Sequence, residues 1–173
     1  MLARRTIRYG AGASLCILLL AGCAEMATTD RSSFKSQYVN ARTALEEGQF
    51  DRATRLYAGL LEDSGALESR VRLEMAHAQL RSGDYAGAAG NARRVAGVQK
   101  GTARSAALSV EGTALHEIGL KQLSGGKPQA GTRSLKAARA ALEEVLTADP
   151  QLDPLGGLAG RKASIDVRLR GQP

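Results

Sequence analysis

An internal repeat constrains the fold of this chain more than any other feature. Residues of one type recur at an offset of 35 positions (76 − 41): Ala41 and Ala76, Gly48 and Gly83, Phe50 and Tyr85, Ala53 and Ala88. Each unit consists of two periodic runs separated by a glycine, which ends a helix because it takes left-handed backbone angles at little cost. Such a period predicts helix pairs that bury their apolar sides against one another.

The periodic runs predict helices at 36–47, 50–62, 68–82 and 85–98. A third unit begins with 112–119 and closes at 138–150, ending in Asp-Pro. It contains an extra stretch, 120–131, which either lengthens two helices or forms a protruding loop. Residues 151–173 predict a short capping helix, because the glycines at 156, 157 and 160 argue against a long one.

These residues resemble the tetratricopeptide family, whose helix pairs repeat about every 34 residues. In that family a small residue lies in the first helix, and Gly-x-Tyr/Phe-x-x-Ala opens the second, as at 48–53 and 83–88. The resemblance covers 34–150 and implies an all-α, antiparallel helix-pair solenoid of about three repeats. The family's aromatic at the fourth position is missing (Gln37, Arg72 and Leu108), and a generic array of helical hairpins stays open.

The composition favours helices that pack closely through small residues, because alanine, leucine and glycine dominate and aromatics are scarce. We expect small side chains to let helix backbones approach at Ala41, Ala53, Ala76, Ala88, Gly112 and Ala138. Aromatic side chains then fill the spaces between the pairs at Phe50, Tyr57 and Tyr85.

The first 22 residues have the order of a secretory signal: three arginines, no acid, and an apolar stretch that runs to Leu20. The stretch is too short for a permanent membrane helix, which needs about 20 residues. The sequence Leu20-Ala21-Gly22-Cys23 resembles the lipobox of bacterial lipoproteins. The resemblance implies cleavage before Cys23, which then carries a diacylglycerol and an acyl chain such as palmitate.

This organisation predicts a signal peptide at 1–22, a lipid-anchored tether at 23–33, the repeat domain at 34–150 and a cap or tail at 151–173. Ala24 follows the cysteine in place of aspartate, which favours an outer-membrane anchor facing the periplasm. Loss of the signal reduces the net charge from +7 to +4 (7 − 3). The sequence contains no cluster of aromatic residues with Lys or Arg, so nucleic-acid binding is not predicted.

The sequence contains no recognisable catalytic constellation. His116-Glu117 lacks the second histidine of a zinc-protease motif, and both His77 and His116 are expected on the surface of first helices. Gly125-Gly126-Lys127 is followed by Pro128 where a phosphate-binding loop needs Ser or Thr. We therefore predict no enzyme, no metal site, and no cofactor beyond the lipid on Cys23.

The remaining candidate site is a binding groove. In tetratricopeptide arrays the first helices line a concave surface, and the resemblance places there Lys35, Tyr38, Arg42, Arg70, Leu73, His77 and Arg81. Cationic points beside apolar contacts predict a protein partner whose segment carries acidic groups. The alternative that these residues form ordinary solvated helix faces remains open.

These features favour a non-catalytic scaffold: an outer-membrane lipoprotein that assists assembly of a pilus or secretion apparatus. The chain looks like tetratricopeptide lipoproteins of such systems, although no residue identifies the machine. One alternative is an envelope-maintenance lipoprotein that recruits cell-wall enzymes. Another, a small hydrolase, rests on little beyond His116-Glu117.

Overall fold

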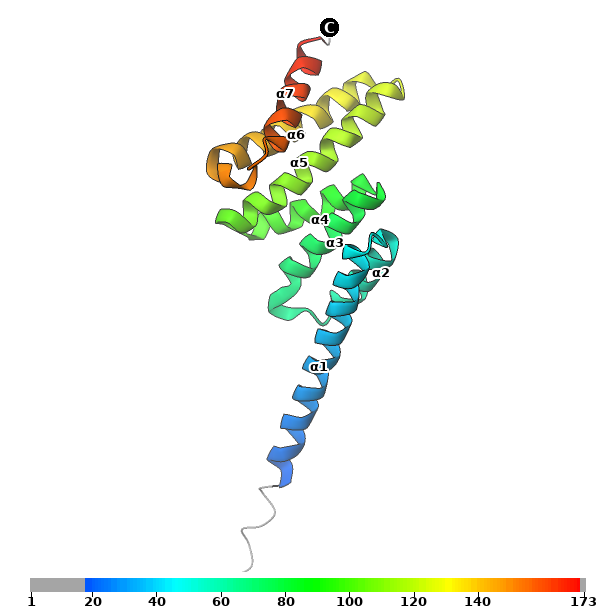
Figure 1. Cartoon of the computed structure of the whole chain (residues 1–173), viewed down its shortest axis with the longest axis vertical. Helices are drawn as coiled ribbons and strands as arrows, with labels where there is room; N and C mark the ends of the chain where they lie inside the picture. Colours follow the sequence, from blue (N-terminus) through cyan, green and yellow to red (C-terminus); the bar gives the residue numbers. More distant parts are fainter. Residues whose placement is uncertain (1–17, 172–173) are drawn as a thin grey trace, which may run out of the picture. The chain divides into compact units, whose positions relative to one another are not determined.

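The computed structural model describes residues 18–171, with side chains from Ser32 onward. Within that range all regular structure is helical, so the predicted all-α class is confirmed. The elements, coloured along the chain in Figure 1, are α1 (Leu18–Glu46), α2 (Phe50–Leu60), the 3-10 turn η1 (Gly65–Leu67), α3 (Glu68–Ser82), α4 (Tyr85–Val98), α5 (Gly101–Ser124), α6 (Pro128–Ala148), the 3-10 turn η2 (Pro150–Leu152) and α7 (Gly157–Arg170).

Helix α1 runs through the boundary between two compact units, residues 1–36 and 37–173. Residues 24–33, expected to form an irregular tether, are helical. Residues 24–47 contain no glycine or proline that would interrupt a helix, so the helical conformation continues almost to Gly48. Residues 1–17 and the side chain of Cys23, the predicted lipidation site, lie outside what the structure describes.

In the second unit, glycines end two helices where the sequence predicted. Gly48 and Gly83 have φ of +76° and +87°, a region that a Cβ disfavours. Helices α3 and α4 have the predicted bounds, whereas α2 ends at Leu60 rather than at residue 62. Asp84 caps α4 by accepting the backbone N–H of Gly87 at 3.0 Å.

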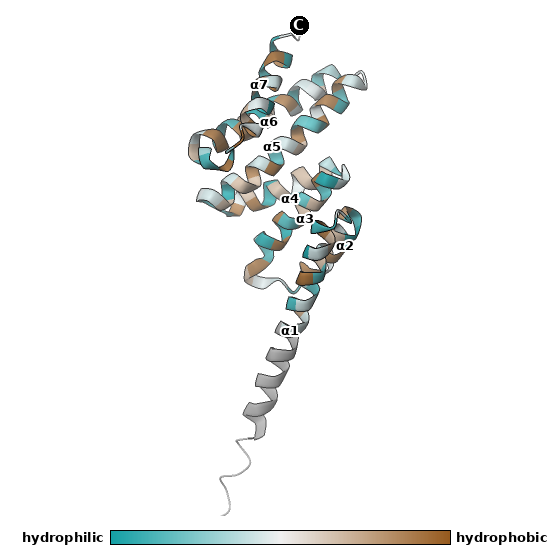
Figure 2. Cartoon of the chain, viewed as in Figure 1, coloured by the Kyte–Doolittle hydropathy of each residue, from teal (hydrophilic) through white to brown (hydrophobic). Residues whose placement is uncertain are grey.

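Small residues lie where the helices of this unit pack. The alanines predicted at close contacts are fully buried: Ala41, Ala53, Ala76, Ala88 and Ala138. A Cβ on the buried Gly112 would stand 2.8 Å from the Leu142 side chain, so glycine lets α5 and α6 approach. Figure 2 shows hydrophilic and hydrophobic residues mixed along these helices, as expected where one side of each is buried.

The extra stretch at 120–131 lengthens two helices rather than forming a loop. Helix α5 continues to Ser124 and α6 begins at Pro128, so only a short turn joins them. A Cβ on Gly131 would lie 3.0 Å from the carbonyl oxygen of Gly119 and 2.6 Å from the Leu123 side chain. These glycines therefore hold α5 and α6 in close contact near the turn.

The C-terminal segment forms the predicted capping helix, but α7 starts at Gly157 and is not stopped by its glycines. The carboxylate of Asp153 accepts two backbone N–H groups of the first turn, each at 2.9 Å. Ile165 is fully buried, and Leu158 and Leu169 pack against the core formed by α4, α5 and α6. The cap and this burial offset the low helix propensity of glycine.

Candidate functional site

A carboxylate on α3 joins three helices of the array. Glu74 accepts hydrogen bonds from the hydroxyl of Tyr38, on α1, at 2.5 Å and from that of Tyr57, on α2, at 2.7 Å. Two guanidinium groups approach the same carboxylate: Nε of Arg70 at 3.3 Å and Nη1 of Arg42 at 3.7 Å. These five residues are called the Glu74 cluster below.

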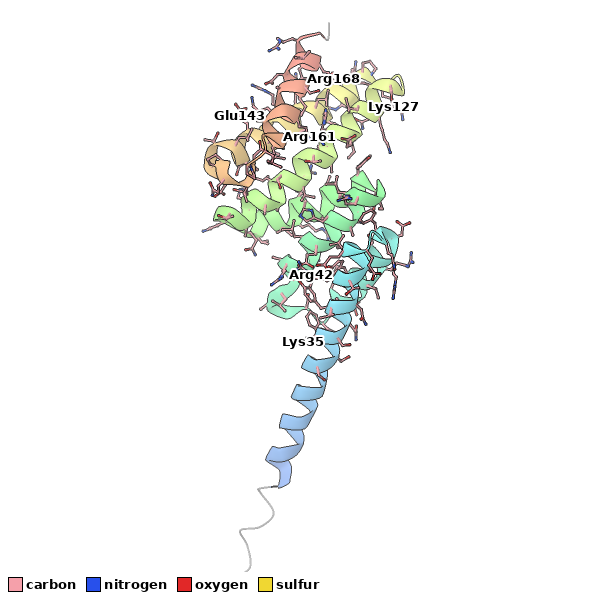
Figure 3. All side chains as sticks on the ribbon, viewed as in Figure 1. Lys35, Arg42, Lys127, Glu143, Arg161 and Arg168 are labelled. Atoms are coloured by element: carbon pink, nitrogen blue, oxygen red, sulfur yellow. The ribbon has the colours of Figure 1, made fainter. Side chains whose placement is uncertain are left out.

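The Glu74 cluster is buried on one side and open on the other. Tyr57 is fully buried, and 16% of the Glu74 side chain is exposed, against 50% for Arg42 and 61% for Arg70. The guanidinium of Arg70 also lies 5.6 Å from the ring centroid of Tyr38. The largely buried Glu74 carboxylate therefore holds two half-exposed cations, Arg42 on α1 and Arg70 on α3. Arg42 is labelled in Figure 3.

The cluster also fixes its own charges. Burial alone would raise the pKa of Glu74, but hydrogen bonds from Tyr38, Tyr57 and Arg70 outweigh it, and the pKa is lowered. Burial, together with the hydrogen bond to Glu74, raises the pKa of Tyr57. At neutral pH the carboxylate is thus charged beside neutral phenols and two cationic side chains.

Among the predicted groove residues, the structure brings Tyr38, Arg42 and Arg70 together. They converge on Glu74, a carboxylate of the same chain, before any partner is bound. Arg42 also pairs with Glu46 one turn away, with Nε 2.9 Å from the carboxylate. The positive charges of Arg42 and Arg70 are therefore partly neutralised by carboxylates of the chain itself.

The other predicted groove residues do not join this cluster. The guanidinium of Arg81 lies 4.9 Å from the ring centroid of Phe50, and both Arg81 and His77 are exposed on α3. Leu73 is partly buried and packs against core residues of α4 and α5, so most of its contacts are internal. Lys35 belongs to the first compact unit, residues 1–36, and is exposed there.

Sequence reasoning missed Glu74 and the hydrogen-bonding role of Tyr57. One signal was available: the arginine-to-glutamate spacing of four residues at 70 and 74, which also occurs at 42 and 46. That spacing places two charges on one helix face. It does not reveal a hydroxyl from another helix, and Tyr57 was assigned to packing alone.

A second ionisable cluster lies between α5 and α7. The surface position predicted for His116 is wrong, because its exposed fraction is 6%. Nη1 of Arg161, labelled on α7 in Figure 3, lies 2.6 Å from Nδ1 of His116 and 2.7 Å from Oε1 of Glu117. Helix α7 covers this part of α5, which the periodicity of α5 alone cannot show.

The charge state of His116 follows from these contacts. Its Nδ1 accepts a hydrogen bond from Arg161, which leaves the ring proton on Nε2. That atom has no hydrogen-bond partner within the described residues. Burial lowers the pKa of His116, and the charges of Arg161 and Arg168 lower it further against the opposing effect of Glu117.

Comparisons with protein-family models, with curated proteins and with solved structures found no match. Over residues 18–171, no group of three or more His, Cys, Asp or Glu side chains is placed to hold a metal ion. No helix in the same range is both long and apolar enough to cross a membrane. The site is therefore interpreted from its own geometry.

Proposed function

We propose that this chain is a lipid-anchored scaffold protein built as a tetratricopeptide-like solenoid of about three helix pairs. The repeat register has support in equivalent burial: Ala41 and Ala76 are fully buried in α1 and α3, as are Ala53 and Ala88 in α2 and α4. Each helix from α2 to α7 packs on the next, and α3 also contacts α5. Stacked pairs require both kinds of contact.

The observation that carries the binding function is the pair of half-exposed arginines in the Glu74 cluster. Arg42 and Arg70 come from different helices, and the shared carboxylate orients both before a partner arrives. Such preorganisation reduces the side-chain entropy lost on binding. Carboxylates of a partner segment would then form charge-assisted hydrogen bonds with Arg42 and Arg70. Arg81 and His77 lie further along the helix that carries Arg70 and would extend this binding surface.

The lipid anchor would fix this array to the outer membrane, facing the periplasm, where it would assist assembly of an envelope machine such as a pilus or secretion apparatus. Two or more acyl chains make a stable anchor. The variant Cys23→Ser should not incorporate radiolabelled palmitate, because a hydroxyl cannot form the thioether. Labelling of the variant, or a mature N-terminus elsewhere, would contradict the anchor.

The binding role is tested by neutralising two exposed cations, Arg70→Gln with Arg81→Gln. We expect the cross-linked partner recovered from cells to fall at least fivefold, and wild-type recovery to fall with salt, because exposed charges are screened over about 8 Å at physiological ionic strength. The matched control is Arg55→Gln with Arg94→Gln, at exposed residues on α2 and α4. Equal loss in both double variants, or in neither, would contradict this surface.

A further inference from the structure

The end of the α5–α6 hairpin is strongly basic. Residues 118–142 contain lysine and arginine but no aspartate or glutamate. Lys127, Arg133 and Lys136 are exposed, and none of them forms an ion pair with another described residue. Lys121 lies nearby on α5, with its Nζ 4.6 Å from the ring centroid of Tyr85. These four residues are called the basic tip below.

The two helices that carry the basic tip are in close contact. Gly119 and Gly131 hold α5 and α6 in close contact beside the turn, and Pro128 fixes the first position of α6. Lys127 precedes that proline, at the turn itself (Figure 3). Lys127 and Arg133 line one surface hollow there, so these two cations lie together at the end of the hairpin.

The end turns of α6 carry none of the charges that its helix dipole favours, namely acids in the first turn and bases in the last. The first turn of α6 holds no acid, and Arg133 and Lys136 occupy its N-terminal half. Glu143 and Glu144 lie in its C-terminal half. Lys127, at the N-cap, is therefore unfavourably placed for the dipole, and no aspartate or glutamate in 118–142 offsets the charge of the basic tip.

We infer that the basic tip docks onto an anionic lipid bilayer surface. Lipid headgroups require only several cations near one plane, without a shaped pocket. A peptide partner is usually held by a buried aromatic or aliphatic anchor. The hollow here is lined by Lys127, Pro128, Gln129, Ala130 and Arg133 and offers no large apolar side chain. The inference is independent of the Glu74 cluster and of lipid on Cys23.

The expected strength of membrane attachment and its dependence on salt follow from electrostatics. Each Lys or Arg close to an anionic membrane strengthens attachment by about fivefold. The attraction falls off within a Debye length, so salt should weaken it strongly. Neutralising three residues of the tip should therefore weaken contact by at least tenfold.

The test places the photo-cross-linker benzoylphenylalanine at Gln129 in the full chain, reconstituted in vesicles of phosphatidylcholine alone or with phosphatidylglycerol. Mass spectrometry then measures lipid adducts on the labelled peptide. We expect about tenfold more adduct with phosphatidylglycerol, and loss of that excess in high salt. The triple variant Lys127→Gln, Arg133→Gln, Lys136→Gln should lose it too.

The matched control, Arg55→Gln, Arg94→Gln, Lys100→Gln, removes the same charge from exposed positions elsewhere and should keep the excess. Equal adduct in the two vesicle types would overturn the inference without reference to any variant. So would an excess that survives neutralisation of the tip. A cross-link in intact cells to an acidic protein, with none to lipid, would assign the tip to that protein instead.

Discussion

Glu74 on α3 and His116 on α5 are both ionisable residues in helix interfaces, but their surroundings act on charge in opposite directions. Two hydroxyls and two guanidinium groups stabilise the charged form of Glu74. Burial and Arg161 destabilise the charged form of His116, whose Nε2 has no partner among the described residues. The first interface therefore stabilises the charged carboxylate of Glu74, whereas the second requires a neutral imidazole at His116. Only the first also includes the half-exposed cations Arg42 and Arg70.

The largest expected effect comes from removing the carboxylate of the first interface. Glu74→Ala leaves the buried Tyr57 hydroxyl without its acceptor and removes the common partner of Arg42 and Arg70. An unsatisfied buried group costs about 1–3 kcal/mol, so the free energy of unfolding should fall by that amount. Denaturant titration measures it. Glu46→Ala, at an exposed residue, should cost under about 0.5 kcal/mol, and equal losses would contradict the role of Glu74.

A smaller and pH-dependent effect is expected at the second interface. Because the pKa of His116 in the folded chain is lowered from 6.5, the unfolded chain binds the proton first, and stability falls as pH drops below about 6.5. Protonation would also place a ring N–H against the cation of Arg161, which loosens α7. The pKa of Glu74 is lowered from 4.5, so its contribution is lost only below about pH 4.5.

Hydrogen exchange of α7 amides, compared in the same sample with amides of α2, whose Tyr57 donates to Glu74, separates these two windows. Between neutral pH and about pH 5, α7 should lose protection while α2, which contains no histidine, keeps it. In His116→Asn an amide oxygen can accept from Arg161 but cannot titrate, so the loss should disappear. If the variant loses α7 protection as the wild type does, a group other than His116 is responsible.

The smallest effect is expected for Tyr38→Phe. This change removes one hydrogen bond to Glu74 while Tyr57 still donates to the other carboxylate oxygen. The free energy of unfolding should fall by about 0.5–1.5 kcal/mol, and the pKa of Glu74 should rise because one stabilising donor is lost. Carbon-13 NMR titration of the carboxylate follows the pKa. An unchanged pKa would mean that the Tyr38 hydroxyl does not bind Glu74 in solution.

Local features of the fold were predictable from sequence. The bounds of α3 and α4 followed from periodicity and from Gly83, because left-handed backbone angles act within one turn of the chain. The buried alanines at 41, 53, 76 and 88 followed from the repeat offset. These properties depend on neighbouring residues or on a repeat that the sequence itself displays.

Contacts between helices were not predictable in the same way. Glu74 was missed because its hydroxyl partners come from two other helices, and the rotation of each helix decides whether they meet. His116 was assigned to the surface because nothing local shows that Arg161, on α7, covers it. Helix α5 begins at Gly101, ahead of the 112–119 run that marked the third unit, and Leu108, the fourth position of that repeat, already lies within it.

The most direct test of the account compares the two interfaces as partner-binding sites in living cells. Benzoylphenylalanine is placed either at His77, which is exposed on α3 one turn after Glu74, or at Thr113, which lines a surface hollow beside α7. A discrete protein adduct should form from position 77, should disappear in the Arg70→Gln, Arg81→Gln variant, and should be absent from position 113. An adduct from position 113 alone, or one from position 77 that survives loss of both arginines, would contradict the proposed binding face.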